Sequence, residues 1–474
     1  MTAAELHDLF PGAVVEKAIA LGPQAARVPR YVAEYLAASA ANQAELVERV
    51  LRAHHFGPEV EDSVMHRLER EGRVVLIDRL QARYDLESGQ FFATLGCLGR
   101  QRLAVELSIP ERYPRTLFGT WGAMELFAVR DSRRLEIKSF LPFEAGLPRW
   151  PAVVVGIKRV GPDQWRDLLL AGCGIDPAGL DERQKWWYVA RLAPLVQDAL
   201  HIVELGPPGT GKSYFAERCF SGSIRLRDDA LSAPVLFSSR LARSPALVAT
   251  YATVALDELE RFDWNQPNLV ASLSDYLREA RLPYQDRPLA GGASFLFLAN
   301  SNTEEKPFEQ ALPASLRNNG SLLDAVRGCI PGYELPRVEP KLLYRGPGLA
   351  ADFLAAVFER LRAQRLGADL TSFVADSIPE HDRISVALWL SAFVKLLFAG
   401  DLEGARPHLA KLVEVAWELR ERVAQAVSRL QDRAGEGSPT SPASAGDQGA
   451  ARSGDSEVAT KAEQGPNGEA SPGR

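Results

Sequence analysis

The sequence predicts an α/β protein, with a parallel-sheet nucleotide-binding core and a helical lid that follow a mixed α/β N-terminal domain. Residues 199–335 alternate apolar runs with helical patterns, which is typical of a parallel sheet with crossover helices. Within that stretch, the octapeptide GPPGTGKS at 206–213 stands between an apolar run and a helical pattern. Residues 73–140 instead contain short strand-like runs separated by turn residues, which predict a small barrel or sandwich.

These changes of pattern divide the 474 residues into five predicted segments. They are an N-terminal mixed helical and β domain at 1–150, a helical connector at 151–198, the α/β core at 199–340, a helical lid at 341–433 and a disordered tail at 434–474. The tail is rich in Gly, Ser, Pro, Ala and Glu and has almost no large apolar residue. Such a segment cannot offset the entropy lost on ordering, so we expect disorder there.

The N-terminal domain is expected to begin with helices and continue as a small β-barrel-like region. Residues 29–70 place apolar side chains near helical spacing, and the strands after residue 73 suggest a barrel or sandwich, with an oligonucleotide-binding (OB-like) barrel as one form. Arginines recur among the strands, and two interpretations stay open: solvated strand faces offset by nearby acids, or a nucleic-acid-binding face. These arginines are Arg79, Arg83, Arg100, Arg102, Arg112, Arg115, Arg133 and Arg134.

The bulk composition narrows the class of protein. A net charge of −6 argues against a uniformly basic nucleic-acid coat, although it allows a local basic face. The four cysteines lie far apart with no CxxC pair, which suggests reduced thiols in a cytoplasmic protein. The first residues lack the basic and apolar regions of a signal peptide, and no run of about 18 apolar residues exists, so we expect no membrane partner.

The octapeptide fits the phosphate-binding pattern G-x-x-x-x-G-K-[ST] at every fixed position. Its glycines let backbone N–H groups curl around phosphates without Cβ clashes. Lys212 is predicted to reach the β- and γ-phosphates and Ser213 to bind magnesium, so we expect ATP and Mg²⁺ as cofactors. The predicted nucleotide-binding residues are Gly206, Pro207, Pro208, Gly209, Thr210, Gly211, Lys212 and Ser213.

Two further apolar runs end in polar side chains. ATVALDE at 252–258 ends in Asp257, predicted to hold magnesium, and Glu258, predicted to activate the attacking water. This acidic pair favours ATP hydrolysis over phosphate transfer to a small molecule. ASFLFLAN at 293–300 ends in Asn300, which would lie between the acids and the γ-phosphate, the sensor-1 position of an AAA+ ATPase.

The order of these motifs is similar to that of AAA+ proteins in general, and a closer resemblance is to the BrxL family, the Lon-like AAA+ proteins of BREX phage-defence systems. The resemblance rests on ERQKWWYVARLAPLV before the phosphate-binding loop, on FLFLAN and CIPGYELPRVEPK after it, and on the N-terminal LFPGAVVEKAIALGPQAARVPRYVAEYL. It runs in order from about residue 8 to 430.

The resemblance implies an ATP-dependent homo-oligomeric ring, either a hexamer or a pair of stacked hexamers. It also implies that the ring binds double-stranded DNA and acts in phage defence, with other BREX components as further partners. Family members often carry a C-terminal domain similar to the Lon protease. After the helix that ends near Arg433, this sequence shows only the predicted tail. We therefore expect an ATPase and no protease activity.

Two departures from the family pattern bear on hydrolysis. The family has an Asp-Arg pair before the IPG strand, whereas here Asp324 is followed by Ala325, which leaves Arg327 and Arg317 as candidate arginine fingers. In the sensor-2 region the family has an arginine where this sequence has Ala387, and Arg383 is the nearest cation. Because a finger contributes about 10³ to 10⁵ in rate, the sequence suggests normal ATP binding and slow hydrolysis.

A predicted hairpin within 275–293 carries the candidate channel contacts. Arg278, Arg281 and Arg287 are placed to touch DNA phosphates, or else to pair with Glu279 and Asp286 as exposed loop charges. The aromatic Tyr284 in the same stretch keeps a second function open, a protein remodeller that grips polypeptide. A third is a nucleotide-regulated scaffold with little turnover, against which Glu258 argues.

Overall fold

The structure is a computed structural model. It describes residues 1–436 except 42, 58, 60, 100, 130–133, 147–148, 227–230, 239–245, 267, 281–291, 302–306 and 368. Residues 1–432 form one compact unit, and 433–474 are assigned to a second. The predicted division of the first unit into four segments stays a prediction. Most of the predicted tail, 437–474, lies outside the described residues.

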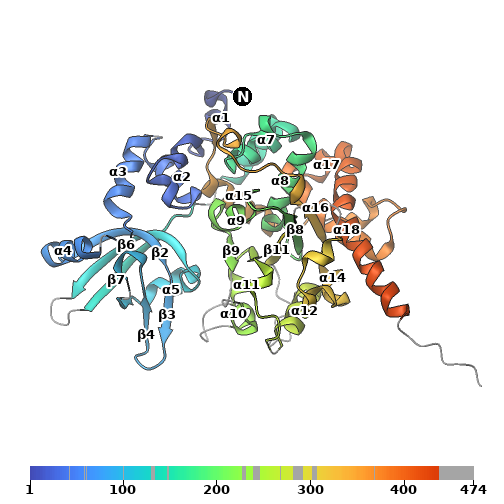
Figure 1. The fold of residues 1–474 in the computed structure, drawn as a ribbon. Coiled ribbons are helices and arrows are strands. Elements are labelled where there is room, and N and C mark those ends of the chain that lie inside the picture. Colours follow the sequence, from blue (N-terminus) through green and yellow to red (C-terminus); the bar gives the residue numbers. More distant parts are fainter. Residues whose placement is uncertain are drawn as a thin grey trace, which may run out of the picture. The chain divides into compact units, whose positions relative to one another are not determined.

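The nucleotide-binding core is built on five parallel strands in the order β12-β8-β11-β10-β9. Figure 1 labels β8, β9 and β11 of this sheet. The strands are β8 (Ile202–Gly206), β9 (Ser223–Leu226), β10 (Thr253–Asp257), β11 (Ser294–Asn300) and β12 (Gly328–Pro331). Nearly all described side chains in them are buried, which explains why they read as continuous apolar runs. This confirms the predicted α/β class and AAA+ core, with β11 between the phosphate-loop strand and the acidic strand.

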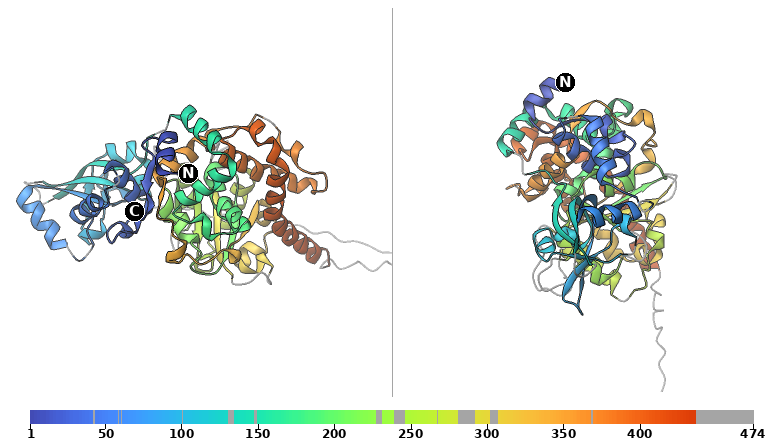
Figure 2. Two further views of the ribbon diagram at one scale, coloured as in Figure 1. Left: turned by 90° about the horizontal axis from the view of Figure 1, so that it is seen from above. Right: turned by 90° about the vertical axis from the view of Figure 1, so that its left-hand side faces the viewer.

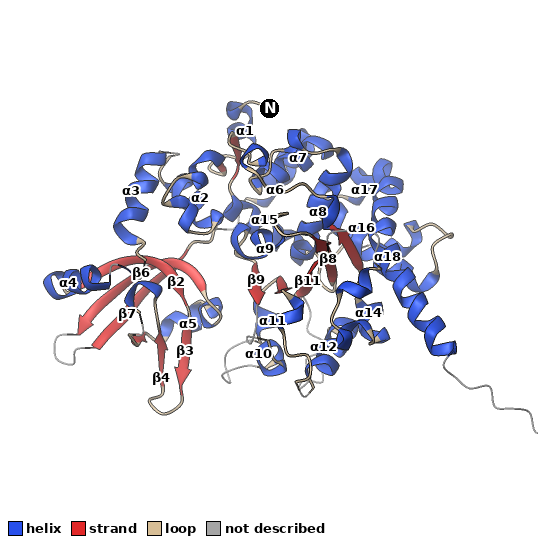
Figure 3. Ribbon diagram, viewed as in Figure 1, coloured by secondary structure: helices blue, strands red, loops and turns tan. Residues whose placement is uncertain are grey.

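Short helices connect these strands (Figure 3). After β8 the chain forms α9 (Lys212–Tyr214) and continues as a π-helix, η7 (Phe215–Cys219). A π-type turn is rare, and it often marks a functional position. The other core helices are α10 (Ala233–Phe237), α11 (Leu247–Thr250), α12 (Leu269–Glu279), α13 (Ala314–Arg317) and α14 (Gly320–Ala325).

The connector and the lid are helical, as predicted. The connector contains α6 (Trp150–Val160), α7 (Pro162–Gly172) and α8 (Glu182–Val196). The lid contains α15 (Ala351–Ala363), α16 (Glu380–Phe398), α17 (Leu402–Ala405) and α18 (Leu409–Glu436). Figure 2 shows α18 as one long continuous helix. It is fixed by the buried Arg420, which donates to Oδ1 of Asp382 at 2.7 Å and Oδ1 of Asp324 at 2.9 Å.

The N-terminal part has the predicted helices and then a mixed sheet, with one short helix, α5, between two of its strands. The helices are α1 (Ala3–Leu9), α2 (Arg30–Ser39), α3 (Ala44–His54), α4 (Glu61–Glu71) and α5 (Ser108–Arg112). Six strands pair in the order β2-β6-β7-β5-β4-β3. They are β2 (Arg73–Leu80), β3 (Ala82–Asp85), β4 (Gln90–Ala93), β5 (Leu103–Val105), β6 (Thr120–Val129) and β7 (Arg134–Pro142). An OB-like barrel stays a prediction.

The first residues also pack directly against the lid's base. Strand β1 (Val14–Glu16) pairs antiparallel with β13 (Pro347–Leu349). Lys17 is fully buried there and donates to Oε2 of Glu34 at 2.6 Å and to the carbonyl oxygens of Gly172 and Leu349 at 2.7 and 2.9 Å. Since a buried ammonium must be paired, these contacts fix the N-terminal chain to the connector and the lid.

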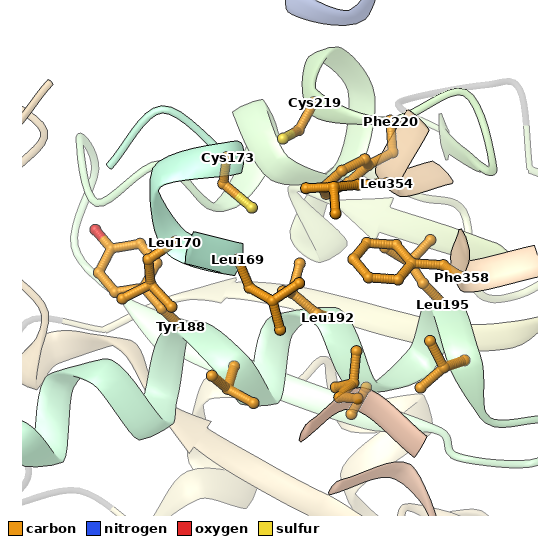
Figure 4. Packing of buried hydrophobic residues seen from close by; sticks show 14 of the residues in the cluster. Leu169, Leu170, Cys173, Tyr188, Leu192, Leu195, Cys219, Phe220, Leu354 and Phe358 are labelled. Carbon is orange, nitrogen blue, oxygen red and sulfur yellow. The ribbon is translucent and has the colours of Figure 1, made fainter. Parts of the chain in front are cut away.

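One large apolar cluster joins the connector, the phosphate-loop helix and the lid (Figure 4). Leu169 and Tyr188 come from α7 and α8, Cys219 from η7 and Phe358 from α15. All four cysteines are buried and free. Among the described residues no single helix is long and apolar enough to cross a membrane, although Glu380–Phe398 with Leu402–Asp432, a pair bent by 100°, passes on length and composition.

Candidate nucleotide-binding site

The backbone of the phosphate-binding loop has the conformation that its sequence requires. Gly209 and Gly211 have φ values of 92° and 85°, a region that residues with a Cβ rarely adopt. Gly206 lies against the turn after β12, where an added Cβ would meet the backbone carbon of Gly332 at 2.7 Å. The glycines therefore shape a loop whose backbone can approach a phosphate closely.

The ammonium group of Lys212 lies inside this loop. It donates to the carbonyl oxygens of Gly206 and Pro207, the latter at 3.0 Å, and the side chain is largely buried. Burial lowers the pKa of Lys212, while the nearby carboxylate of Glu204 acts in the opposite direction. The residue thus presents a preorganised donor at the point where the phosphates would bind.

Ser213, in α9 after β8, and Asp257, at the end of β10, come together although β11 lies between the two strands. The Ser213 hydroxyl donates to Oδ2 of Asp257 at 2.7 Å. Asp257 ends β10 and is itself buried. A hydroxyl and a carboxylate beside a phosphate-binding loop are ligands that suit Mg²⁺, which prefers one or two protein oxygens together with phosphate oxygens. The described residues contain no cluster of three or more His, Cys, Asp or Glu able to hold a metal alone.

Glu258 follows directly, in a strained conformation. Its φ and ψ are 57° and 55°, the left-handed region, which costs a non-glycine residue roughly 1–2 kcal/mol. The side chain is partly exposed and pairs with Nη1 of Arg261 at 3.1 Å. Strain of this kind persists where the surrounding structure enforces it, often at active sites. The conformation therefore favours the predicted role of Glu258 as general base.

Asn300 is brought to the same edge of the sheet. In the parallel register of β11 and β8, Asn300 lies beside Gly206, while Leu298 lies beside Asp257 of β10. Asn300 is exposed at the strand end, between the phosphate loop and the acidic pair. The predicted nucleotide-binding residues, Glu258 and Asn300 thus converge at the carboxyl ends of three parallel strands.

Family comparisons match both halves of the chain. The family described as "Lon-like protease BrxL-like, ATPase domain" matches residues 136–435, more than half of the chain. The chain belongs to the BrxL family. A second family, "BREX system Lon protease-like protein BrxL N-terminal", matches residues 8–127. The resemblance that the sequence motifs indicated is thereby confirmed, and the chain carries an ATPase domain of BrxL type.

Two BrxL relatives are similar to this chain over most of its length. "Lon-like protease BrxL" of Escherichia coli O9:H4 (strain HS) is 24% identical over 450 residues, and that of Bacillus cereus (strain H3081.97) is 22% identical over 450 residues. Each alignment covers 90% of this chain but only 65% and 66% of those proteins, so the chain spans just under two thirds of their length.

Among solved structures, a full-length MCM homologue from Methanopyrus kandleri matches with a TM-score of 0.42 at 12% identity. That match covers 74% of this chain and 78% of the homologue. A likeness of this size carries no argument about the fold or function of this BrxL chain.

The structure explains the IPGYELP segment that supported the resemblance to BrxL. The backbone N–H of Val338 donates to the carbonyl of Gly209 at 2.8 Å. Glu334 accepts from Trp187 Nε1 and Arg183 Nε, each at 2.7 Å, which fixes the segment to α8. Gly332 also packs on β8, so this segment lies against the phosphate-binding loop and fixes its backbone.

The structure contains a buried ion pair next to the loop that the sequence analysis did not predict. Arg191 of α8 donates from Nε to both oxygens of Glu204 at 3.1 Å, and both side chains are almost fully buried. The guanidinium also lies over the rings of Tyr188 and Phe215, at 4.8 and 5.1 Å from their centres. A glutamate inside the apolar run HIVEL was the sequence signal, since a charge in a buried strand needs a partner.

The two candidate fingers have different surroundings. Arg327 lies at the amino end of β12, where its N–H donates to His201 at 2.6 Å, about 17 Å of strand away from Gly206. Its Nη1 lies 3.5 Å from the Ser385 hydroxyl, within its own lid. By contrast, the half-buried side chain of Arg317 on α13 has no partner among the described residues. A role for either residue stays a prediction.

The two positions that the sequence analysis singled out as departures, Ala325 and Ala387, are buried, and the charged residues near them have partners. Asp324 accepts from the buried Arg420 and so fixes α14 to α18. Arg383 donates to the carbonyls of Ile378 and Asp376 at 3.1 and 3.2 Å, which keeps it on its own loop. Ala387 is buried in α16.

The candidate DNA contacts are only partly described. Arg278 is exposed and lies 3.7 Å from Glu279, whereas Arg281, Tyr284, Asp286 and Arg287 lie outside the described residues. Several arginines of the N-terminal sheet are committed to protein contacts, which favours the solvated-face interpretation for them. They are Arg79 with the Phe118 carbonyl, Arg102 with Asp85, and Arg115 with Glu144. Arg100 and Arg133 lie outside the described residues.

Proposed function

We propose that this chain binds ATP with Mg²⁺ at residues 206–213 and hydrolyses it with Glu258 as general base. The observation that carries the proposal is the 2.7 Å contact between Ser213 and Asp257 at the mouth of a loop that already holds the Lys212 ammonium. One hydroxyl and one carboxylate would hold the metal, and the metal would neutralise charge on the phosphates.

In this arrangement Glu258 takes a proton from a water aligned with the terminal phosphate, and Asn300 orients that water from the adjacent strand. Breaking the pair with Arg261 frees the carboxylate of Glu258 for this step. Arg317, which lacks a partner among the described residues, is the better candidate to stabilise transition-state charge across a subunit boundary.

We further propose that the protein forms a ring of identical subunits, hexameric or stacked as two hexamers, that binds double-stranded DNA in BREX defence. Family membership supports this proposal, since the description of the N-terminal family names the BREX system. A proteolytic activity is not part of the proposal, and the expectation that this chain is not a protease stays a prediction.

ATP turnover measured with and without duplex DNA tests the proposal. The parent protein, Lys212→Ala and Glu258→Gln are compared at saturating ATP. Lys212→Ala should lose binding, whereas Glu258→Gln should bind ATP normally and hydrolyse it at least 100-fold more slowly, the range expected on losing a general base. Turnover unchanged in Glu258→Gln would refute its role, and ATP binding unchanged in Lys212→Ala would refute the site. If duplex DNA neither binds to the protein nor changes its ATP turnover, the proposal of DNA binding is refuted and the proposal of ATP hydrolysis stands.

A further inference from the structure

A cavity of about 360 Å³ lies where the N-terminal sheet meets the nucleotide-binding core. The sheet contributes Arg79 of β2 and residues 119–121 around the start of β6, and the core contributes residues from 217–224 together with Tyr251. The Tyr251 hydroxyl donates to the carbonyl oxygen of Gly119 at 3.4 Å, which joins the two walls directly. None of the phosphate-loop residues, all of which the structure describes, is part of this lining. The cavity is therefore separate from the candidate nucleotide-binding site.

Three guanidinium groups line this cavity. They belong to Arg27, Arg79 and Arg218, and the lining contains one acid, Glu217, so three positive charges stand against one negative charge. Arg27 is the only one of the three with an ion pair in the described part of the chain, a long contact of 3.4 Å to Glu59. Like charges that are brought together repel one another unless an anion lies between them. The net charge of +2 on these walls, in a chain of net charge −6, therefore favours an anionic ligand.

Two of these arginines are held in place yet keep most of their donors. Arg79 donates from Nη2 to the carbonyl oxygen of Phe118 at 3.0 Å. Arg218 donates from Nη2 to the carbonyl oxygens of Ala26 and Val28 at 3.0 and 2.8 Å. Among the residues that the structure describes, Nε and Nη1 of both side chains have no hydrogen-bond partner. Since a planar guanidinium matches two oxygens of a phosphate, each side chain is oriented by the protein and still able to bind one.

Two buried hydroxyl groups belong to the same lining. Tyr31 and Thr120 are 5% and 6% exposed, and neither hydroxyl makes a hydrogen bond within the described part of the chain. A buried polar group costs free energy unless it is hydrogen-bonded, so both hydroxyls need a partner that the protein does not supply there. Burial raises the pKa of Tyr31, which keeps its proton available for donation. The cavity thus combines neutral and charged donors, next to the indole ring of Trp121.

We propose that this cavity binds a small phosphate-bearing ligand at a second site, apart from the phosphate-binding loop. The phosphate oxygens would accept from Arg79 and Arg218, and the hydroxyls of Tyr31 and Thr120 would complete the donor set. The volume lies within the range of small-molecule pockets, roughly 300–1,000 Å³. Duplex DNA is far wider than such a cavity and would reach only its rim. The proposal does not depend on ATP binding at residues 206–213.

A ligand at this site would connect two parts of the fold. Arg79 belongs to the N-terminal sheet and Arg218 to η7 of the core. A phosphate group that accepts from both side chains adds contacts that exist only while the sheet and the core are attached. Because a ligand stabilises the state to which it binds, its presence would strengthen this attachment.

Calorimetric titration with inorganic pyrophosphate, at constant ionic strength, tests the proposal. The titration uses Lys212→Ala, which should lose phosphate binding at the loop, so that the remaining heat reports the second site. Adding Arg79→Gln to that variant should weaken pyrophosphate binding at least about tenfold, because a charged bidentate donor is lost. Arg73→Gln is the matched control, since Arg73 is exposed on the same strand and outside the lining, and its effect should stay within about twofold.

A second measurement needs no variant, should Arg79→Gln not fold. Phenylglyoxal modifies arginines in the parent protein, and mass spectrometry of its peptides reports each position. Pyrophosphate should slow the modification of Arg79 and Arg218 at least about threefold and leave Arg73 unchanged, whereas sodium chloride at the same ionic strength should protect none of them.

The outcomes distinguish this site from the candidate nucleotide-binding site. The proposal is overturned if Lys212→Ala binds no pyrophosphate, if Arg79→Gln leaves its affinity unchanged, or if pyrophosphate protects neither Arg79 nor Arg218. Protection of these arginines by duplex DNA alone would also overturn it and would assign them to a DNA-binding surface. If the parent binds no ATP while pyrophosphate binding still depends on Arg79, the proposed function fails and the second site stands.

Discussion

The Ser213 hydroxyl donates a hydrogen bond to Oδ2 of Asp257, 2.7 Å away, although 44 residues separate them in the chain. Ser213 follows β8 and Asp257 ends β10, and β11 lies between these strands. The contact therefore crosses the strand end that carries Asn300. A metal bound by this pair would lie between the phosphate loop and the candidate water-activating residues.

This geometry predicts a loss of magnesium dependence in Asp257→Asn. A neutral amide binds Mg²⁺ far more weakly than a carboxylate, so ATP binding should no longer respond to the metal. In the parent protein, removing Mg²⁺ with EDTA should weaken ATP binding about tenfold or more, and in Asp257→Asn the two conditions should agree within about twofold. Asp263→Asn, an exposed acid shortly after the same strand, is the control. An equal magnesium effect in Asp257→Asn and the parent would contradict the assignment.

The convergence of these residues could be predicted from the sequence because parallel strands impose it, whereas their roles stay predictions. Once Gly206, Asp257 and Asn300 are placed at the ends of neighbouring parallel strands, their convergence follows from the topology. By contrast, the contacts of Arg30 with Tyr214 and of Arg191 with Glu204 join residues that are 184 and 13 positions apart on different elements. Such pairs depend on how helices pack, which a single sequence does not reveal. The sequence shows only that charged residues stand inside apolar runs and therefore need partners.

Tyr214→Phe tests the link between the N-terminal segment and the loop helix. The substitution removes the acceptor of the buried Arg30 Nε and leaves that donor unsatisfied. The free energy of unfolding should fall by about 1–3 kcal/mol, and amide hydrogen exchange within 20–30 should accelerate. Tyr84→Phe, at a residue that is 38% exposed, should change neither quantity. Unaltered exchange in Tyr214→Phe would show that the hydrogen bond does not hold the segment.

Asp352 should make stability depend on pH. Burial raises the pKa of Asp352 from 3.8 to about 6, with the Glu34 carboxylate adding to the effect and the Lys17 ammonium opposing it. Because the folded pKa lies above the unfolded one, the neutral acid favours the folded state. That stability is present below pH 3.8 and is lost as the pH rises through about 6.

The matching variant is Asp352→Asn, which stays neutral at every pH. At pH 8 its free energy of unfolding should exceed that of the parent by on the order of 2–3 kcal/mol, and the gain should shrink as the pH falls from 6 toward 4. Denaturant titrations at several pH values measure it, with Glu359→Gln, exposed on the same helix, as control. A gain independent of pH, or a loss at pH 8, would exclude the proposed cause.

In the proposed ring, the arginine finger of each site comes from the neighbouring subunit. Arg317→Ala should leave ATP binding within about twofold and lower turnover by about 10³-fold, the effect measured when a finger is lost. Arg327→Ala should have a smaller effect on turnover, because that side chain points toward Ser385 in its own lid. A turnover of several per second in the parent that neither substitution changes would refute both the finger and slow hydrolysis.

Mixing two inactive variants decides whether Arg317 acts on a neighbouring subunit. Glu258→Gln lacks the base but keeps Arg317, and Arg317→Ala keeps Glu258. If the finger acts across the boundary, a mixed ring contains some sites in which an intact Glu258 faces an intact Arg317. Because each such site regains the transition-state contact, turnover of the mixture should then exceed that of either variant alone. For random assembly with independent sites, the turnover should reach up to about a quarter of the parent value. A mixture no more active than its components, with mixed rings verified by mass, would place Arg317 outside the shared site.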